Sequence, residues 1–271
     1  MTRSKRNVIG IISIKGGVGK TTCTVNLGAA LSSTFGKKTL IVDANFSAPN
    51  LGLHLGLSRP SLALGDVMRK GIHISQAVHN FEKNLHVIPG ALSGRKINPF
   101  QLRGKLDEIT DNYDSVLLDS SPNLGHEMLS TMLAADELLV VTTPDLPTLS
   151  CTMHAVRIAR TKRTPILGII LNKVRHRDYE LNVEEIENAS EAPVLAVLPD
   201  EQSINESLAL AIPAVFHRPV SNSSVAYNQL AAALAGSSYS DPRVVSRIRR
   251  FFARTPSKLE MNRALIRKNG I

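Results

Sequence analysis

The chain of 271 residues is poor in cysteine and in aromatic residues: it has two cysteines, no tryptophan, and 4% aromatic residues in all. Cys23 and Cys151 cannot build a disulfide framework or a four-cysteine zinc site. No apolar run reaches the length of about 18 residues that a transmembrane helix needs. The apolar run at residues 8–14 is followed by no small-residue cleavage site of the kind that ends a signal peptide. We therefore expect a cytoplasmic protein with reduced thiols.

Positive charge is concentrated at the C-terminal end. Residues 237–271 contain nine Lys or Arg and two acidic residues, a net charge of +7, whereas residues 1–236 have a net charge of +2. Hydrophobic residues make up 43% of the chain, enough for a sizeable core. A nearly neutral body with a basic C-terminal segment predicts an anionic partner for that segment, either a membrane or a nucleic acid.

Short apolar runs alternate with longer amphipathic stretches along the chain. The apolar runs predict buried strands at Val8–Ile14, Thr39–Val42, Leu85–Ile88, Ser115–Leu118, Leu138–Thr142, Ile166–Leu171 and Val194–Val197. The amphipathic stretches predict helices at Lys20–Thr34, Pro99–Thr110, Gly125–Ala134, Pro147–Thr161, Val183–Ala189 and Asn222–Ala235. This alternation predicts an α/β fold with a mostly parallel twisted sheet flanked by helices, which binds its ligand at the carboxyl ends of the strands.

A glycine-rich segment with the sequence KGGVGKTT spans residues 15–22, after the first predicted strand and at the start of the first predicted helix. Backbone N–H groups of such a loop turn toward phosphate oxygens, and the helix N-terminus favours negative charge. The Lys20 ammonium would reach the β- and γ-phosphates, and the Thr21 hydroxyl would bind Mg²⁺. A glycine-rich turn without nucleotide is the alternative. We predict a nucleotide-binding loop made of Gly16, Gly17, Val18, Gly19, Lys20, Thr21 and Thr22.

This segment resembles the deviant phosphate loop of the MinD/ParA ATPases, which are P-loop NTPases of the SIMIBI type. The resemblance extends over residues 8–236, and we place the boundary of a P-loop ATPase domain at Gly236. It implies ATP or ADP and Mg²⁺ as cofactors. It also identifies Lys15 as the lysine that crosses to the partner's nucleotide in an ATP-bound homodimer.

Two aspartates, Asp43 and Asp119, each end a hydrophobic strand, where a carboxylate can hold Mg²⁺ or its water ligands. The segments 40–51 and 113–125 are similar to the two switch regions of the family, which makes Thr21, Asp43 and Asp119 the expected metal site. The family usually has a second aspartate that orients the attacking water, and this chain has Asn45 there. An amide cannot accept a proton from water, so we expect ATP hydrolysis to be slow. The expected catalytic residues are Lys15, Lys20, Asp43 and Asn45.

Asn172 and the pair Pro199-Asp200 follow the last two predicted strands. The amide of an asparagine can pair with both a donor and an acceptor on the edge of adenine. Asn172 is similar to the asparagine that contacts adenine in the family. In the family, backbone atoms at the positions that correspond to Pro199 and Asp200 also contact the base. A simple turn asparagine is the alternative to this adenine site.

The C-terminal segment predicts a basic amphipathic helix. On a helical projection, five apolar residues fall within an arc of about 120°, and arginines occupy the remainder. The apolar residues are Val244, Val245, Ile248, Phe251 and Phe252. This pattern is typical of an interfacial membrane anchor and is similar to the C-terminal membrane-targeting helix of MinD proteins. The alternative is an apolar stripe that packs on the ATPase domain.

Three functions remain open. The first is a MinD-like ATPase that binds the inner face of the cell membrane when ATP-bound and positions a cellular structure, with an unidentified activating or cargo protein. The second is a ParA-like ATPase that uses its basic residues on DNA, although phosphate binding needs no apolar stripe. The third is a nucleotide-binding adaptor with little turnover, which Asn45 favours. An iron–sulfur scaffold ATPase is excluded because the chain has no CxxC pair.

Overall fold

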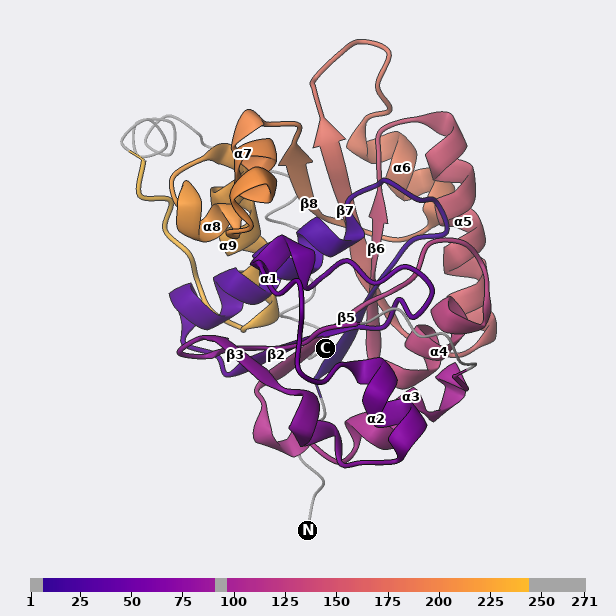
Figure 1. The fold of residues 1–271 in the computed structure, drawn as a ribbon. Coiled ribbons are helices and arrows are strands. Elements are labelled where there is room, and N and C mark those ends of the chain that lie inside the picture. The colour runs from indigo at the N-terminus through magenta and orange to yellow at the C-terminus, as the bar shows by residue number, and fades with distance from the viewer. Residues whose placement is uncertain (1–6, 91–96, 244–271) are drawn as a thin grey trace.

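The computed structural model describes residues 7–90 and 97–243, and within them eight strands form one sheet in the order β3-β4-β2-β5-β1-β6-β7-β8 (Figure 1). The strands are β1 Val8–Ile12, β2 Thr39–Asp43, β3 His79–Glu82, β4 Leu85–Ile88, β5 Ser115–Asp119, β6 Glu137–Thr142, β7 Ile166–Val174 and β8 Val194–Pro199. Only the pairing of β3 with β4 is antiparallel in this described part. The predicted α/β class with a mostly parallel sheet is confirmed.

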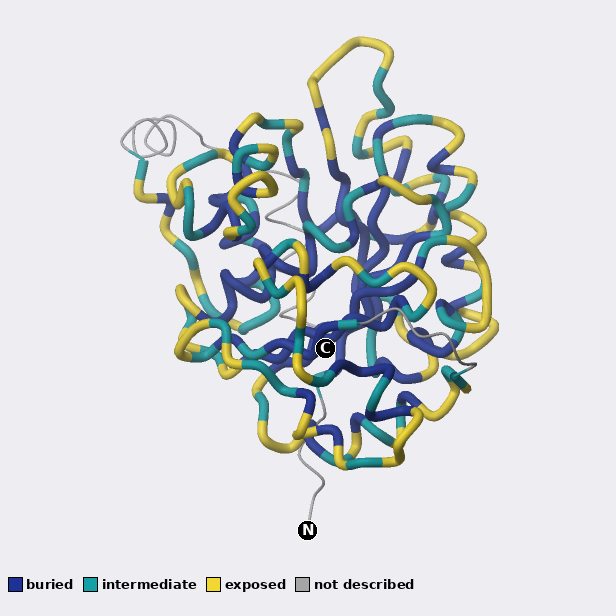
Figure 2. The backbone as a smooth tube through the Cα atoms, viewed as in Figure 1, coloured by how far each residue is buried: buried dark blue, intermediate teal, exposed yellow. Residues whose placement is uncertain are grey.

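Helices cover both faces of the sheet (Figure 1). They are α1 Lys20–Phe35, α2 Leu64–Lys70, α3 Leu102–Leu106, α4 His126–Ala134, α5 Leu146–Thr161, α6 Val183–Ser190, α7 Gln202–Leu210, α8 Ala214–His217 and α9 Asn222–Leu234. Side chains alternate along each strand: Leu40 and Val42 join the core under α2 to α6, and Ile41 joins the core under α1, α8 and α9. The strands in the middle of the sheet are therefore buried on both faces. Figure 2 shows the buried residues concentrated along these strands.

Several predicted boundaries differ from the structure. The predicted helix over residues 99–110 is instead a 3₁₀ turn at Pro99–Gln101, the short α3 and a second 3₁₀ turn at Thr110–Asn112. Gly104 within α3 has low helix propensity, and Leu102, Leu106 and Ile109 are the apolar residues of the segment that are buried in the core. Strand β3 was not predicted, because it is a polar edge strand of four residues whose side chains alternate between intermediate and exposed.

All strands except β3 point the same way, so the loops that follow them gather at one edge of the sheet. The glycine-rich loop follows β1, and a 3₁₀ turn at Leu53–Leu55 lies in the connection after β2. Among the helices of the described residues, none is both long and apolar enough to span a bilayer. The predicted apolar stripe at residues 244–252 lies outside the described residues.

Candidate nucleotide-binding site

The glycine-rich loop turns tightly between β1 and α1. Gly17 has φ 76° and Gly19 has φ 96°, a region that residues with a Cβ rarely adopt. A Cβ on Gly19 would also lie 2.3 Å from Nδ2 of Asn172. The loop ends at Lys20, the first residue of α1, so unpaired N–H groups of the first helical turn face the space in front of it. This arrangement suits an anion.

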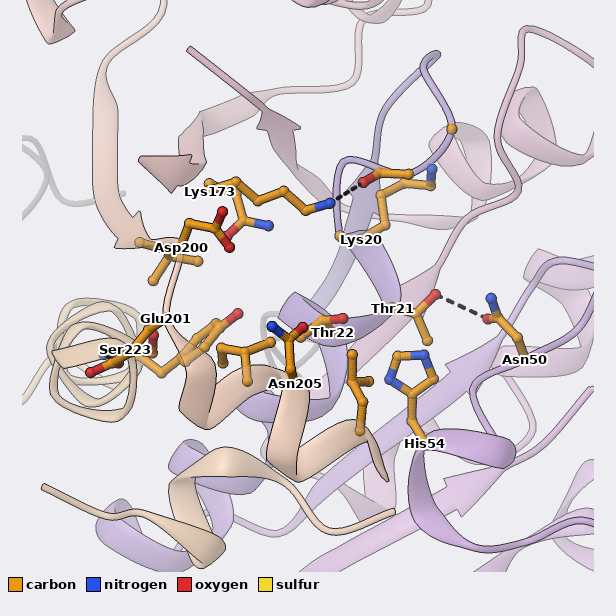
Figure 3. Close-up of a pocket in the computed structure, with 18 of the residues that line it drawn as sticks. Lys20, Thr21, Thr22, Asn50, His54, Lys173, Asp200, Glu201, Asn205 and Ser223 are labelled. Carbon is orange, nitrogen blue, oxygen red and sulfur yellow. Dashed lines mark hydrogen bonds between the residues drawn. The ribbon is translucent and has the colours of Figure 1, made fainter. Parts of the chain in front are cut away.

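A cavity of about 620 Å³ lies in front of this loop and reaches the ends of β7 and β8 (Figure 3). Thr21, Asn50 and His54 lie on one side of it, and Lys173 and Asp200 lie on the other (Figure 3). The predicted residues that line it are Gly16, Gly17, Gly19, Lys20, Thr21, Thr22, Asn45, Asn172, Pro199 and Asp200. The structure therefore brings most of the predicted site residues together around one space.

Three other predicted residues, Val18, Asp43 and Asp119, are buried behind the cavity wall. Lys20 is only 7% exposed, and its Nζ lies 3.5 Å from the carbonyl oxygen of Lys15. Burial lowers the pKa of Lys20, and the charge of nearby Asp119 partly offsets this. A buried cation with one long hydrogen bond to a carbonyl is well placed to bind an anionic ligand.

Asp43 and Asp119 face each other at the ends of the paired strands β2 and β5. Asp119 Oδ2 accepts a hydrogen bond from the Thr21 hydroxyl at 2.7 Å, and Asp43 accepts backbone N–H groups of Asn50 and Leu51 at 3.0 and 3.1 Å. Burial raises the pKa of Asp43 to about 6 and, together with the charge of Asp43, that of Asp119 to about 7. Two carboxylates and a hydroxyl form an oxygen-only donor set, which fits Mg²⁺.

These raised pKa values predict how the metal-free chain responds to pH. Because the folded-state pKa of Asp119 lies above the ordinary value of 3.8, the folded chain holds this proton more tightly than the unfolded chain. The contribution of Asp119 to the free energy of unfolding is thus largest at low pH and falls as pH rises to about 7. Asp119→Asn should raise the free energy of unfolding at pH 8, without Mg²⁺, by about 1–3 kcal/mol.

Urea unfolding of both proteins in chelator at pH 5 and pH 8 measures this effect. The gain from Asp119→Asn should be smaller at pH 5, and added Mg²⁺ should stabilise only the wild-type chain. An equal difference at the two pH values would contradict the raised pKa of Asp119.

Asn45 is 5% exposed and fixed within its own loop. Its Nδ2 donates to the carbonyl oxygen of Ala48 at 2.6 Å, and its Oδ1 accepts the N–H of Ala48 at 3.2 Å. Both ends of the amide are therefore occupied by the backbone of the loop after β2. This engagement was not predictable from the sequence, which gives only the residue type.

Lys15 does not line the cavity. Its Nζ lies 3.2 Å from Oδ1 of Asp145 and 2.6 Å from Oγ1 of Thr148, at the N-terminus of α5. Although burial raises the pKa of Asp145, hydrogen bonds from Thr143, Thr148 and Lys15 lower it to about 2. Lys15 thus forms an ion pair within its own chain.

Lys173 is a cavity residue that the sequence analysis missed. Its Nζ donates to the carbonyl oxygen of Gly17 at 2.8 Å (Figure 3). The Nδ2 of the neighbouring Asn172 donates to the carbonyl oxygen of Val18 at 2.7 Å. The end of β7 is therefore bonded to the glycine-rich loop. Asn50, which accepts from the Thr21 hydroxyl at 3.0 Å, and His54 were also missed. A single lysine, asparagine or histidine outside a recognised motif carries no sequence signal of its own.

Comparisons with known proteins identify the family of this chain. A family model described as an AAA domain matches residues 6–164. An uncharacterized ATP-binding protein of Methanocaldococcus jannaschii is 34% identical over 85% of this chain and 88% of its own length. The cell division ATPase MinD of Pyrococcus furiosus is 34% identical with a TM-score of 0.79, over 83% of this chain and 96% of that one.

A second solved structure is the septum site-determining protein MinD of Pyrococcus horikoshii, complexed with Mg-ADP. It is 30% identical to this chain, with a TM-score of 0.80, and the match covers 92% of this chain and 99% of that one. The residues matched by the family model include the glycine-rich loop, and the matches to the two solved structures cover most of the chain. The chain therefore belongs to the MinD/ParA family of P-loop ATPases.

Proposed function

We propose that this protein is a MinD-like switch, which dimerises with ATP, binds the membrane in that state and is released by slow hydrolysis. Its role is to position a cellular structure such as the division site. The ATPase domain spans residues 1–236, and residues 237–271 are the linker and membrane-binding tail. The observation that carries the proposal is the position of Lys15. This lysine lies beside the cavity, but its side chain forms an ion pair with Asp145 and does not enter the cavity.

Each site residue has a role in this proposal. The glycine-rich loop with Lys20 and Thr22 holds the phosphates of ATP, and Thr21, Asp43 and Asp119 hold Mg²⁺ directly or through water. When bound, Mg²⁺ neutralises phosphate charge. Asn172 and the backbone of Pro199 and Asp200 contact the adenine. This assignment is supported by the lining of the cavity and by the Mg-ADP complex of the Pyrococcus horikoshii relative.

Exposed apolar side chains around the site support a second copy of this chain as the partner. At least one such side chain comes from each segment that follows β2, β5, β6, β7 and β8, and the first in each segment is between 40% and 79% exposed. These are Leu53, Leu124, Leu146, Tyr179 and Leu208. Apolar residues that gather at one edge favour a protein–protein interface. In the dimer, Lys15 exchanges Asp145 for the partner's nucleotide.

Lys15→Ala tests this dimer. We expect ATP binding to stay within about twofold of wild type, because Lys15 does not line the cavity. ATP-dependent dimerisation should fall about tenfold or more, because the γ-phosphate loses a cation from the partner. Calorimetry measures the first quantity, and light scattering with a non-hydrolysable ATP analogue measures the second.

Asp145→Asn is the matched variant for this test. It keeps Lys15 but removes the carboxylate that competes for it, so dimerisation should be unchanged or stronger. Normal dimerisation of Lys15→Ala would show that the lysine does not act across the interface.

The tail attaches this dimer to the membrane. One tail with the apolar residues Val244, Val245, Ile248, Phe251 and Phe252 gives weak adsorption to anionic lipid, whereas two tails in a dimer gain avidity. The protein is then cytoplasmic and attaches peripherally to the inner face of the cell membrane. DNA is the second choice of anionic partner, in a ParA-like function, and an activating or cargo protein remains to be identified.

A nucleotide-binding adaptor with little turnover is the second candidate, and the bonding of Asn45 to Ala48 favours it. An amide held by two backbone groups has little freedom to orient water, and it cannot accept a proton from it.

Asn45→Asp should raise the ATPase rate by about tenfold or more. The carboxylate loses the hydrogen bond to the carbonyl of Ala48 and becomes free to hold the attacking water. Steady-state phosphate release measures the rate. Asn45→Ala, which frees the loop without supplying a carboxylate, should not accelerate hydrolysis. An unchanged rate in Asn45→Asp would show that other groups position water, and it would favour the adaptor function.

A further inference from the structure

The cavity contains an ion pair at the side opposite to Thr21 and Asn50. Figure 3 shows Lys173 and Asp200 on this side of the cavity. Asn172 and Lys173 belong to the end of β7 and Arg175 follows it, whereas Pro199 ends β8 and Asp200 follows it; all five line the cavity. Nε of Arg175 lies 2.6 Å from Oδ2 of Asp200. Both partners line the cavity, so this ion pair faces the space where a nucleotide base lies if its phosphates occupy the glycine-rich loop.

The backbone around the ion pair is fixed by hydrogen bonds. The Glu180 carboxylate accepts the N–H of Arg175 at 3.1 and 3.0 Å and that of Arg177 at 3.2 Å. The N–H of Asp200 donates to the carbonyl oxygen of Val174 at 3.0 Å, which ties the end of β8 to β7. The Arg175 side chain therefore reaches Asp200 from a supported position and not from a free loop.

The charge of Asp200 matters for the identity of the base. A carboxylate only accepts hydrogen bonds. The Watson–Crick edge of guanine offers two adjacent donors, N1–H and the N2 amino group, which a free carboxylate matches. The same edge of adenine offers one donor at N6 and an acceptor at N1, which repels a carboxylate oxygen. An Asp200 carboxylate without a cationic partner would thus favour guanine, whereas a carboxylate paired with Arg175 would not.

We propose that the Arg175–Asp200 ion pair keeps this site selective for adenine over guanine nucleotides. Arg175 is a positioning residue: it holds the Asp200 carboxylate and neutralises its charge, so that the amide of Asn172 and the backbone decide which base is bound. This inference rests on the proposed nucleotide site. It adds a specificity element whose two members come from the ends of neighbouring strands.

Calorimetric titration of the full chain with MgADP and MgGDP tests the proposal. Arg175→Ala should shift the ratio of the two dissociation constants toward guanine by about tenfold, the size of one charge-assisted hydrogen bond. The side chain of Arg175 is 60% exposed, so its removal leaves no hole in the core. Arg175→Lys, which still pairs with Asp200, should keep the wild-type ratio.

Two further variants separate the ion pair from general effects of the loop. Adding Asp200→Asn to Arg175→Ala should restore adenine preference, because an amide no longer presents two acceptors. Arg177→Ala is the matched control: Arg177 lies on the same loop, and its side chain makes no hydrogen bond or ion pair with the described residues. The ratio of the dissociation constants for MgADP and MgGDP should be the same in Arg177→Ala as in wild type.

The outcomes distinguish this inference from the proposed function. If wild type binds MgADP and Arg175→Ala has the wild-type ratio, the inference is wrong and the nucleotide site stands. A shift that persists in the double variant would also overturn it, because Asp200 would then not be its cause. If wild type binds neither nucleotide, the proposed function itself fails.

Discussion

Lys20→Ala is expected to abolish ATP binding, with a loss of about 100-fold or more in affinity. The Lys20 ammonium is nearly buried at the floor of the cavity, and its Nζ makes one long hydrogen bond to the Lys15 carbonyl. Phosphate groups in the glycine-rich loop would pair with this cation away from bulk water, where the interaction is strong. Without it, the phosphates lose the cation at the end of the glycine-rich loop.

Calorimetric titration with MgATP measures this loss. Lys162→Ala, which removes an exposed lysine at the end of α5, should bind ATP as wild type does. Circular dichroism must show that Lys20→Ala is folded, because removal of a buried cation also leaves two buried carboxylates less well paired. Wild-type affinity in a folded Lys20→Ala variant would overturn the assignment of the site.

The second large effect is expected in the tail, where Phe251→Ser combined with Phe252→Ser should abolish liposome binding. This double variant keeps every positive charge but removes most of the apolar surface that can insert between lipids. Each remaining arginine attracts anionic lipid with about 1 kcal/mol. Without the inserted phenylalanines, this attraction is too weak to keep a tail stably attached.

The matched control replaces both phenylalanines with leucine, which keeps an apolar face and should keep liposome binding. Binding of DNA, if any, should survive the serine variant, because phosphate contacts depend on charge. Unaffected liposome binding, together with tight and steeply salt-dependent binding of DNA, would favour the ParA-like function instead.

The phosphate loop could be predicted from the sequence because its chemistry is local. Gly17, Gly19, Lys20 and Thr21 act through a turn and the first turn of one helix, and eight consecutive residues specify both. Apolar strands that alternate with amphipathic helices likewise predict the sheet, since each pattern is read within one segment.

Long-range contacts could not be predicted in this way. Lys15 and Asp145 are 130 residues apart, and their ion pair depends on β1 and β6 being neighbours in the sheet. The pairing of Arg175 with Asp200 depends in the same way on β7 and β8.

Helix α2 was missed because its seven residues are too few to show a helical period, although Leu64, Val67 and Met68 all face the core. Helix α7 was missed because it leaves Leu208 and Leu210 exposed. Strand β3 is polar and lies at the edge, where burial imposes no pattern.

Co-sedimentation with anionic liposomes tests most directly whether ATP controls the attachment of this protein to the membrane. The full chain and a chain ending at Gly236 are compared, each with MgADP and with a non-hydrolysable ATP analogue. We expect the full chain to sediment with liposomes only in the ATP-like state, and the shortened chain to remain in the supernatant in both states. Equal sedimentation of the full chain with both nucleotides, or of the shortened chain with liposomes, would contradict the proposed switch.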